Sequence, residues 1–334
     1  MSSLRLLHFE NEADFIEALR PHDDHAMNFA LGSLLDNLDR SQAVSQERWG
    51  DHSRVLLGIY MDNDLLVTLT KSAARIPWML SAPSDVDPLK LKERIIETME
   101  LLVTFLPTVV DPNTVDKIVG LKDIVDAFID AWIAFMASKH VALQSPTATF
   151  TVRACYATRS TIPQSQPTLF ADNIGLVVDM DQAEHLIPLA MEFSKHGPNP
   201  TTSEGARHVM REAIQSKRLW VCRLGEAIAG YALVGRITPR TVAIRNVFVL
   251  PDYRRRGIAE ALVHATTAFY LNTDSAGDGV PDMPKTQVCL QVADPAVERI
   301  YKRCGFLIDE DAKDPITGKS GCFISVFRGI VPAM

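Results

Sequence analysis

The stretch VFVLPDYRRRGIAEAL, residues Val247–Leu262, decides the fold expected for this chain. Apolar residues over Thr241–Leu250 predict a strand, and the apolar period over Gly257–Leu271 predicts a helix that follows it after a short turn. The start of a helix presents unpaired N–H groups and the positive end of its dipole, which suits a phosphate group. The pattern alone is equally compatible with a solvated basic turn at a strand–helix corner.

The residues of the turn are of the types that bind an anion. Gly257 lets the backbone approach a ligand with no Cβ in the way, and Ala259 keeps the next turn of chain small. Arg254, Arg255 and Arg256 add positive charge and donors that bind oxygen anions in pairs. We therefore expect a phosphate group at this turn.

A second motif, VADPAVERIYKRCGF, follows downstream at Val292–Phe306. Asp294 before Pro295 predicts the start of a helix, with the aspartate as N-cap and the proline in the first helical position. Tyr301 lies seven residues after Asp294, or about two helical turns, so the two residues lie on roughly the same face. Gly305 then predicts the end of the helix.

Together, the two motifs resemble those of the GNAT acetyltransferase superfamily. The pattern R-x-x-G-x-A, after a V-x-V strand end and a P-x-Y turn, is similar to the family's pyrophosphate loop, Q/R-x-x-G-x-G/A. The resemblance implies an α/β fold with a mixed sheet, and acetyl-CoA as the acyl donor for an amine. It also implies that the backbone of Val247–Val249 pairs with pantetheine and that the amides of Arg255–Glu260 hold the pyrophosphate. The cofactor-binding residues expected on this basis are Val247, Phe248, Val249, Arg254, Arg255, Arg256, Gly257, Ile258, Ala259, Glu260 and Asp294.

The downstream motif resembles the family element N-x-x-A-x-x-x-Y-x-x-x-GF, with two departures. Asp294 replaces the asparagine that contacts the cofactor in the family, and Val297 replaces the alanine. The family tyrosine often protonates the departing CoA thiolate, so the resemblance implies that Tyr301 is the catalytic acid. The alternative is an aromatic residue that packs under the helix. Some relatives carry a glutamate base five residues before the asparagine, where this chain has Cys289.

Direct transfer requires a neutral amine, so a base or a chain of waters must take a proton from the acceptor. Cys289 raises the idea of a covalent acyl-enzyme, but an isolated cysteine on a strand is more often a buried apolar residue. The residues considered for contact with the acceptor are Glu192, His196, Glu204 and Asn246.

The length of 334 residues suggests two domains. We expect a degenerate GNAT-like domain at 1–160, a linker at 161–170 within the stretch that begins STIPQSQP, and the catalytic domain at 171–334. The pattern H-x-M-N-x-x-L-G-x-L at His25–Leu34 resembles the opening of tandem GNAT proteins whose N-terminal domain is degenerate. The patterns predict a single strand over 142–157, a helix over 121–138, and final strands at 306–308 and 322–328.

Bulk composition narrows the function class. A net charge of −7 disfavours nucleic acid and anionic membranes as partners. The five scattered cysteines form no CxxC pair, so we expect reduced thiols, no metal site and a cytoplasmic location. The expected function is an acetyl-CoA-dependent N-acetyltransferase that acts on a small amine in a ternary complex, with a homodimer left open. The alternatives are a protein lysine or N-terminal acetyltransferase, and a non-catalytic acyl-CoA-binding regulatory protein.

Overall fold

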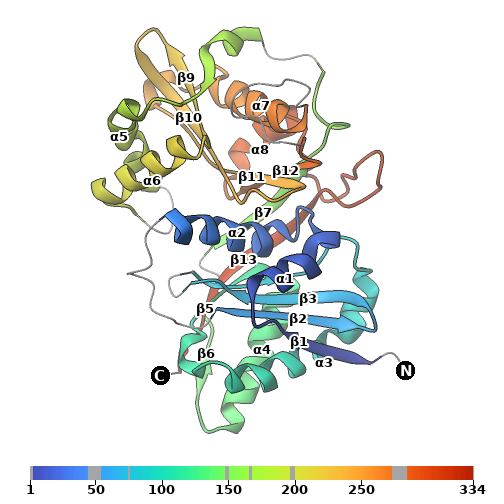
Figure 1. Ribbon diagram of the computed structural model, residues 1–334. Helices are drawn as coiled ribbons and strands as arrows, with labels where there is room; N and C mark the ends of the chain where they lie inside the picture. Colours follow the sequence, from blue (N-terminus) through green and yellow to red (C-terminus); the bar gives the residue numbers. More distant parts are fainter. Residues whose placement is uncertain are drawn as a thin grey trace. The chain divides into compact units, whose positions relative to one another are not determined.

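Strands and helices alternate along the chain in the computed structural model and group into two units (Figure 1). The structure describes residues 3–43, 54–73, 76–146, 150–164, 168–195, 200–272 and 284–333. The first unit comprises Met1–Ala154 with Phe323–Met334, and the second comprises Cys155–Cys322. None of the helices in these described ranges combines the length and apolarity needed to cross a membrane.

The first unit is a mixed sheet with helices on both faces. Its strands run in the order β1-β2-β3-β4-β5-β13, and β4 and β5 are parallel while the other pairs are antiparallel. The elements of this unit are β1 (Leu4–His8), α1 (Glu12–Leu19), α2 (Asn28–Ala43), β2 (Val55–Met61), β3 (Asp64–Lys71), β4 (Trp78–Ser81), α3 (Pro88–Phe105), β5 (Lys117–Leu121), α4 (Lys122–Ser138), β6 (Leu143–Gln144), β7 (Phe150–Ala157), β13 (Cys322–Gly329) and β14 (Val331–Pro332).

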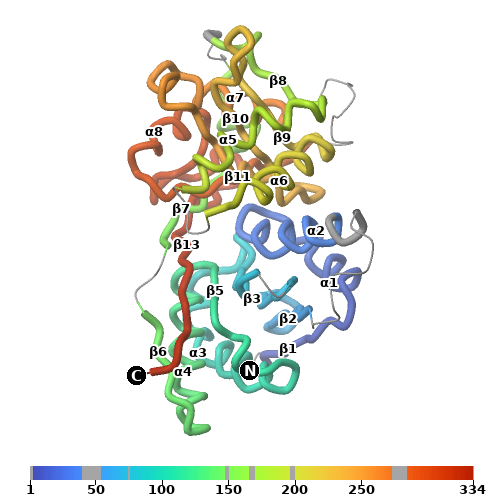
Figure 2. Tube along the Cα trace, turned by 90° about the vertical axis from the view of Figure 1, so that its left-hand side faces the viewer, coloured from blue at the N-terminus to red at the C-terminus, as the bar shows by residue number. Residues whose placement is uncertain are grey.

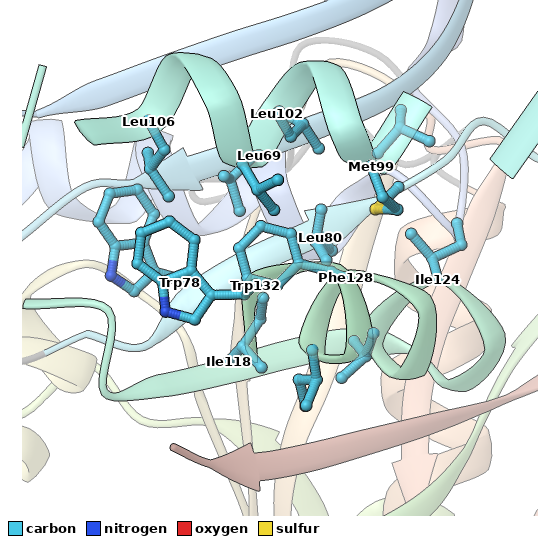
Figure 3. Close-up of a cluster of buried hydrophobic side chains, with 14 of the residues drawn as sticks. Leu69, Trp78, Leu80, Met99, Leu102, Leu106, Ile118, Ile124, Phe128 and Trp132 are labelled. Carbon is cyan, nitrogen blue, oxygen red and sulfur yellow. The ribbon is translucent and has the colours of Figure 1, made fainter. Parts of the chain in front are cut away.

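Both faces of this sheet are buried because successive residues of a strand point to opposite sides. In β2, Leu57 and Ile59 join the cluster beneath α3 and α4, whereas Leu56 and Tyr60 join the cluster beneath α1 and α2. The larger cluster is centred on aromatic rings and is drawn in Figure 3. Its labelled members come from β3, β4, β5, α3, the 3₁₀ turn that follows α3, and α4: Leu69, Trp78, Leu80, Met99, Leu102, Leu106, Ile118, Ile124, Phe128 and Trp132.

The last strand of the chain completes the first unit. Figure 2 shows β13, in red, beside β5, and their register pairs Ser325 with Leu121 and Arg328 with Ile118. The sequence placed this strand in the second domain, because nothing in its apolar pattern reveals which sheet edge it joins. Only the pairing with β5, about 200 residues earlier in the chain, assigns it to the first unit.

The second unit repeats the same order of elements. In the first unit, the antiparallel strands β1 to β4 are followed by α3, by β5, which is parallel to β4, and by α4. In the second unit, the antiparallel strands β8 to β11 are followed in the same way by α7, by β12, which is parallel to β11, and by α8. The boundary between the units divides β7, whose residues 155–157 belong to this second unit, and β7 is the neighbour of β12. The elements are β8 (Ile174–Leu176), α5 (Ala183–Ser194), α6 (Ser203–Gln215), β9 (Leu219–Leu224), β10 (Ala227–Gly235), β11 (Thr241–Val249), α7 (Ile258–Leu271), β12 (Gln287–Val292) and α8 (Pro295–Arg303).

Helices cover both faces of this second sheet as well. Along β9, Leu219 and Val221 pack in the cluster that contains α5 and α6, and Trp220 and Cys222 pack in the cluster that contains α7. Each unit is therefore a three-layer arrangement with the mixed sheet in the middle, which confirms the predicted α/β fold class.

Several predicted elements need correction. The segment 142–157 is two strands, β6 and β7, rather than one, and the strand β5 precedes the helix that was expected to begin at residue 121. The segment 306–308 is not a strand, although the Leu307 N–H donates to the Tyr156 carbonyl at 3.0 Å. The predicted linker at 161–170 begins as packed structure, since Ile162 is buried in the core of the second unit; residues 165–167 lie outside the described residues.

Candidate acyl-CoA site

The predicted turn lies at the point where two parallel strands separate. β11 and β12 pair only from Thr241 with Gln287 to Ile244 with Leu290, and β11 then continues to Val249. At the same point the register of β11 with β10 shifts between Leu233 and Val234 of β10, which marks a β-bulge. Because a bulge bends a strand and increases its twist, it directs the end of β11 away from β12.

The separation exposes backbone groups of β11. The Leu250 N–H donates to the Ala229 carbonyl on β10 at 3.0 Å, and the polar groups of alternate residues in a strand point to the same edge. Phe248 therefore also directs its backbone to β10. Val247 and Val249 direct theirs to the opposite edge, where β12 has diverged. This edge is the place where an extended ligand arm could pair with the chain.

The arginines of the turn have different roles in the structure. Arg254 folds back onto β11: its Nε donates to the Val249 carbonyl at 3.0 Å and its guanidinium lies 5.7 Å from the centroid of the Phe248 ring. Arg256 donates to the Asp252 carbonyl at 3.1 Å. Arg255 is exposed and makes no contact of this kind with any described residue. Among the three predicted phosphate ligands, Arg255 is thus the side chain with no such contact among the described residues.

The backbone of the turn forms a concave row of amides. Arg255 has φ +61° and Gly257 has φ +86°, so left-handed residues alternate with their neighbours, an arrangement that directs successive N–H groups toward one side. A Cβ on Gly257 would meet nothing within 4 Å; the positive φ, and not crowding, is what favours glycine there. None of the amides from Arg255 to Glu260 has an acceptor among the described residues, and no side chain caps α7.

The corresponding helix of the first unit differs in this respect. α3 follows β4 as α7 follows β11, but its N-cap Asp87 accepts a hydrogen bond from the Leu89 N–H at 2.9 Å. The carboxylate therefore already occupies the position at which an anion would bind the helix. This acid supports the prediction that the N-terminal domain is degenerate.

The helix α8 has the predicted bounds, with Asp294 just before its first residue and Tyr301 within it. Asp294 is the N-cap, as expected, and accepts from the Ala296 N–H at 2.9 Å. Gly305 ends the helix with φ +88°, and a Cβ there would lie 2.5 Å from the Thr161 carbonyl oxygen. The residue after the helix is therefore required to be glycine both by its backbone conformation and by the close approach of another segment.

Tyr301 is largely buried and its ring packs edge-on to Phe306, with centroids 6.2 Å apart. Burial, with smaller contributions from the Cys155 and Cys304 thiols and from Asp294, raises the pKa of Tyr301 to about 12. Its hydroxyl makes no hydrogen bond with the described residues. The phenol is therefore protonated at neutral pH, and its ring packs in the core as the packing alternative expected; the catalytic role of Tyr301 stays a prediction.

The remaining candidates from the sequence are dispersed. Cys289 is buried against Tyr156 and Ala243, as a structural cysteine would be. Glu192 pairs with Lys195, and Glu204 pairs with Arg207, so both carboxylates are held by surface ion pairs. His196 lies outside the described residues.

Asn246 is the candidate that lies on the separated part of β11. The Asn246 side chain lies beside the Tyr231 hydroxyl, which is buried and makes no well-formed hydrogen bond in the described part of the chain. Sequence reasoning missed Tyr231, because one aromatic residue in an apolar strand carries no signal of its own. The described residues also hold no group of three His, Cys, Asp or Glu side chains arranged to bind a metal ion.

Comparison with known proteins agrees with this geometry. Residues 215–307 match the acetyltransferase (GNAT) domain, a segment that includes β11, the turn, α7, β12 and α8. No curated protein matches the chain in sequence. The second unit therefore holds the part of the chain that is similar to the acetyltransferase (GNAT) domain.

Solved structures are similar over almost the whole chain. A GNAT-family acetyltransferase from Colwellia psychrerythraea superposes with a TM-score of 0.51 at 11% identity, covering 97% of this chain and 99% of that one. A GCN5-related N-acetyltransferase from Sphaerobacter thermophilus has a TM-score of 0.46 at 11% identity, with 98% and 95% covered. A tandem GNAT protein from the clavulanic acid biosynthesis pathway has a TM-score of 0.43 at 10% identity, with 99% and 100% covered. At these identities, the Colwellia structure shows a shared fold and nothing further.

Proposed function

We propose that this protein transfers the acetyl group of acetyl-CoA to a primary amine by direct attack in a ternary complex, and that the acceptor is a small molecule. The observation that carries the proposal is the row of unpaired amides from Arg255 to Glu260, at the start of α7 and within the segment that matches the acetyltransferase domain. Unpaired amides at a helix start, with an available arginine beside them, fit a pyrophosphate.

The groups that would hold acetyl-CoA lie on the end of β11 and on the turn that follows it. The Val247 N–H and carbonyl and the Val249 N–H point to the edge that β12 leaves, so they would pair with the amide groups of pantetheine. The Val249 carbonyl is already used by Arg254, which makes that arginine a support for the strand. Arg255, together with the amides of the turn, would hold the pyrophosphate. Acetyl-CoA supplies the activated thioester.

Tyr301 is the proposed catalytic acid. When the amine nitrogen bonds to the thioester carbonyl carbon and the carbon–sulfur bond breaks, the sulfur leaves as a thiolate that needs a proton. The Tyr301 hydroxyl is neutral at working pH and has no partner of its own among the described residues. It would donate its proton to the sulfur and later regain one from solvent.

Two substitutions relative to the family pattern favour a second candidate, a non-catalytic acyl-CoA-binding protein. Cys289 stands where some relatives carry a glutamate base, and it is buried. Asp294 adds a negative charge where the family has a neutral asparagine. An enzyme would then need solvent, or a residue outside this motif, to take the proton of the amine.

A CoA-release assay tests the proposal. The purified protein is incubated with acetyl-CoA and with amino acids, polyamines, arylamines, aminoglycosides or lysine peptides, and free thiol is followed by its reaction with a disulfide dye. Release with a small amine supports the proposal, and release with lysine peptides alone would favour a protein acetyltransferase. Binding of acetyl-CoA with no release for any amine would favour the non-catalytic candidate.

A further inference from the structure

The third residue of α7 is an acid that does not cap its own helix. A glutamate at this position ordinarily reaches back to the N-cap amide, as in a capping box. Other helices of the chain are capped by acids: Asp87 accepts from an amide of α3, and Asp294 accepts from an amide of α8, both at 2.9 Å. Glu260 is instead at the third position of α7, from which its carboxylate can reach back to the amide of the N-cap Gly257, one of the amides that we assign to the pyrophosphate.

Arg303, at the end of α8, forms an ion pair with the Glu260 carboxylate. Its Nε and Nη2 both donate to one carboxylate oxygen of Glu260, at 2.8 and 2.5 Å. On the same side, the Cys304 thiol lies 3.4 Å from the Glu260 carbonyl. The Glu260 side chain is 20% exposed and the Arg303 side chain is 48% exposed, so only the carboxylate end of the pair is shielded from solvent.

We propose that Arg303 is a positioning residue that keeps the Glu260 carboxylate from capping α7, and so leaves the amides of the turn to the pyrophosphate. This inference rests on the proposed function. The carboxylate and a phosphate compete for the same donors, and the carboxylate has the advantage of being attached to the helix. The ion pair removes this competitor and neutralises its charge.

The proposal predicts a specific pattern of affinities for CoA, measured by titration calorimetry on the full-length protein. Arg303→Met is expected to weaken CoA binding roughly fivefold to tenfold, because the freed acid now caps the helix. Adding Glu260→Ala to Arg303→Met is expected to restore the affinity to within about twofold of Glu260→Ala alone. The matched control is Arg207→Met, which removes an exposed arginine that pairs with Glu184 on other helices of the same unit.

The second variant separates competition from simple support of the fold. If Arg303 only tied α8 to α7, the double variant would bind CoA as weakly as Arg303→Met or more weakly, and this result would overturn the proposal. Unchanged affinity in Arg303→Met would overturn it as well, and so would an equal loss in Arg207→Met. Absence of CoA binding by the unaltered protein would instead refute the proposed function and the inference with it.

Discussion

Replacing Tyr301 by phenylalanine separates the chemical role of this residue from its packing role. The ring stays in place, and the hydroxyl that is lost makes no hydrogen bond with the described residues. We therefore expect the free energy of unfolding at pH 7 to change by less than about 1 kcal/mol. If the hydroxyl protonates the departing thiolate, kcat should fall roughly a hundredfold or more, with little change in the affinity for acetyl-CoA.

The raised pKa of Tyr301 gives the same variant a second signature. The pKa is about 12 in the folded state and 10.0 in the unfolded chain, a difference of about 12 − 10 = 2. Below pH 10 the phenol is protonated in both states and contributes no pH dependence. Between pH 10 and 12 only the unfolded chain loses the proton, so stability falls as pH rises, by roughly 2.7 kcal/mol in total. Tyr301→Phe should remove this part of the alkaline loss.

Tyr270→Phe is the matched control. Burial also raises the pKa of Tyr270 to about 12, and the residue lies near the end of α7 in the core, with no part in the proposed chemistry. Both variants should show a flatter loss of stability above pH 10 in urea titrations, but only Tyr301→Phe should lose turnover in the CoA-release assay. Full turnover in Tyr301→Phe would refute the role of Tyr301 as acid. If Tyr301→Phe lost as much stability above pH 10 as the unaltered protein does, the claim that burial raises the pKa of Tyr301 would be refuted.

Three further predictions concern the caps and turns of the site. Gly257→Glu should abolish CoA binding in calorimetry while the circular dichroism spectrum is retained, because it adds a carboxylate to the anion site at a positive φ; retained binding would contradict the pyrophosphate assignment. Asp294→Ala should lower the free energy of unfolding by about 1 kcal/mol, whereas Asp294→Asn should keep the cap and bind CoA at least as tightly; equal losses in urea titrations would exclude a capping role. Gly305→Ala should lower the free energy of unfolding by more than about 2 kcal/mol, because Gly305 has φ +88° and the new Cβ would lie 2.5 Å from the Thr161 carbonyl oxygen. A loss of less than about 1 kcal/mol in urea titrations would show that the segment around Thr161 moves aside freely.

The amino-acid sequence alone determined the local parts of the site. The turn at Gly257 and the helix from Asp294 to Gly305 were predicted at their observed positions, because caps, turns and helix periods depend on residues within four positions of one another. The burial of Cys289 was likewise expected, since an isolated cysteine on an apolar strand has few other roles.

Only the tertiary structure decided the non-local relations. Pairing with β5 placed β13 in the first unit, against the expected domain boundary. The contact of the Arg254 side chain with the Val249 carbonyl was not evident from the sequence of the turn. Glu260 and Arg303 are 43 residues apart, so no local pattern could reveal that they form an ion pair. Contacts of this kind depend on how strands and helices pack, and a sequence pattern records which face of an element is apolar but not which distant partner it meets.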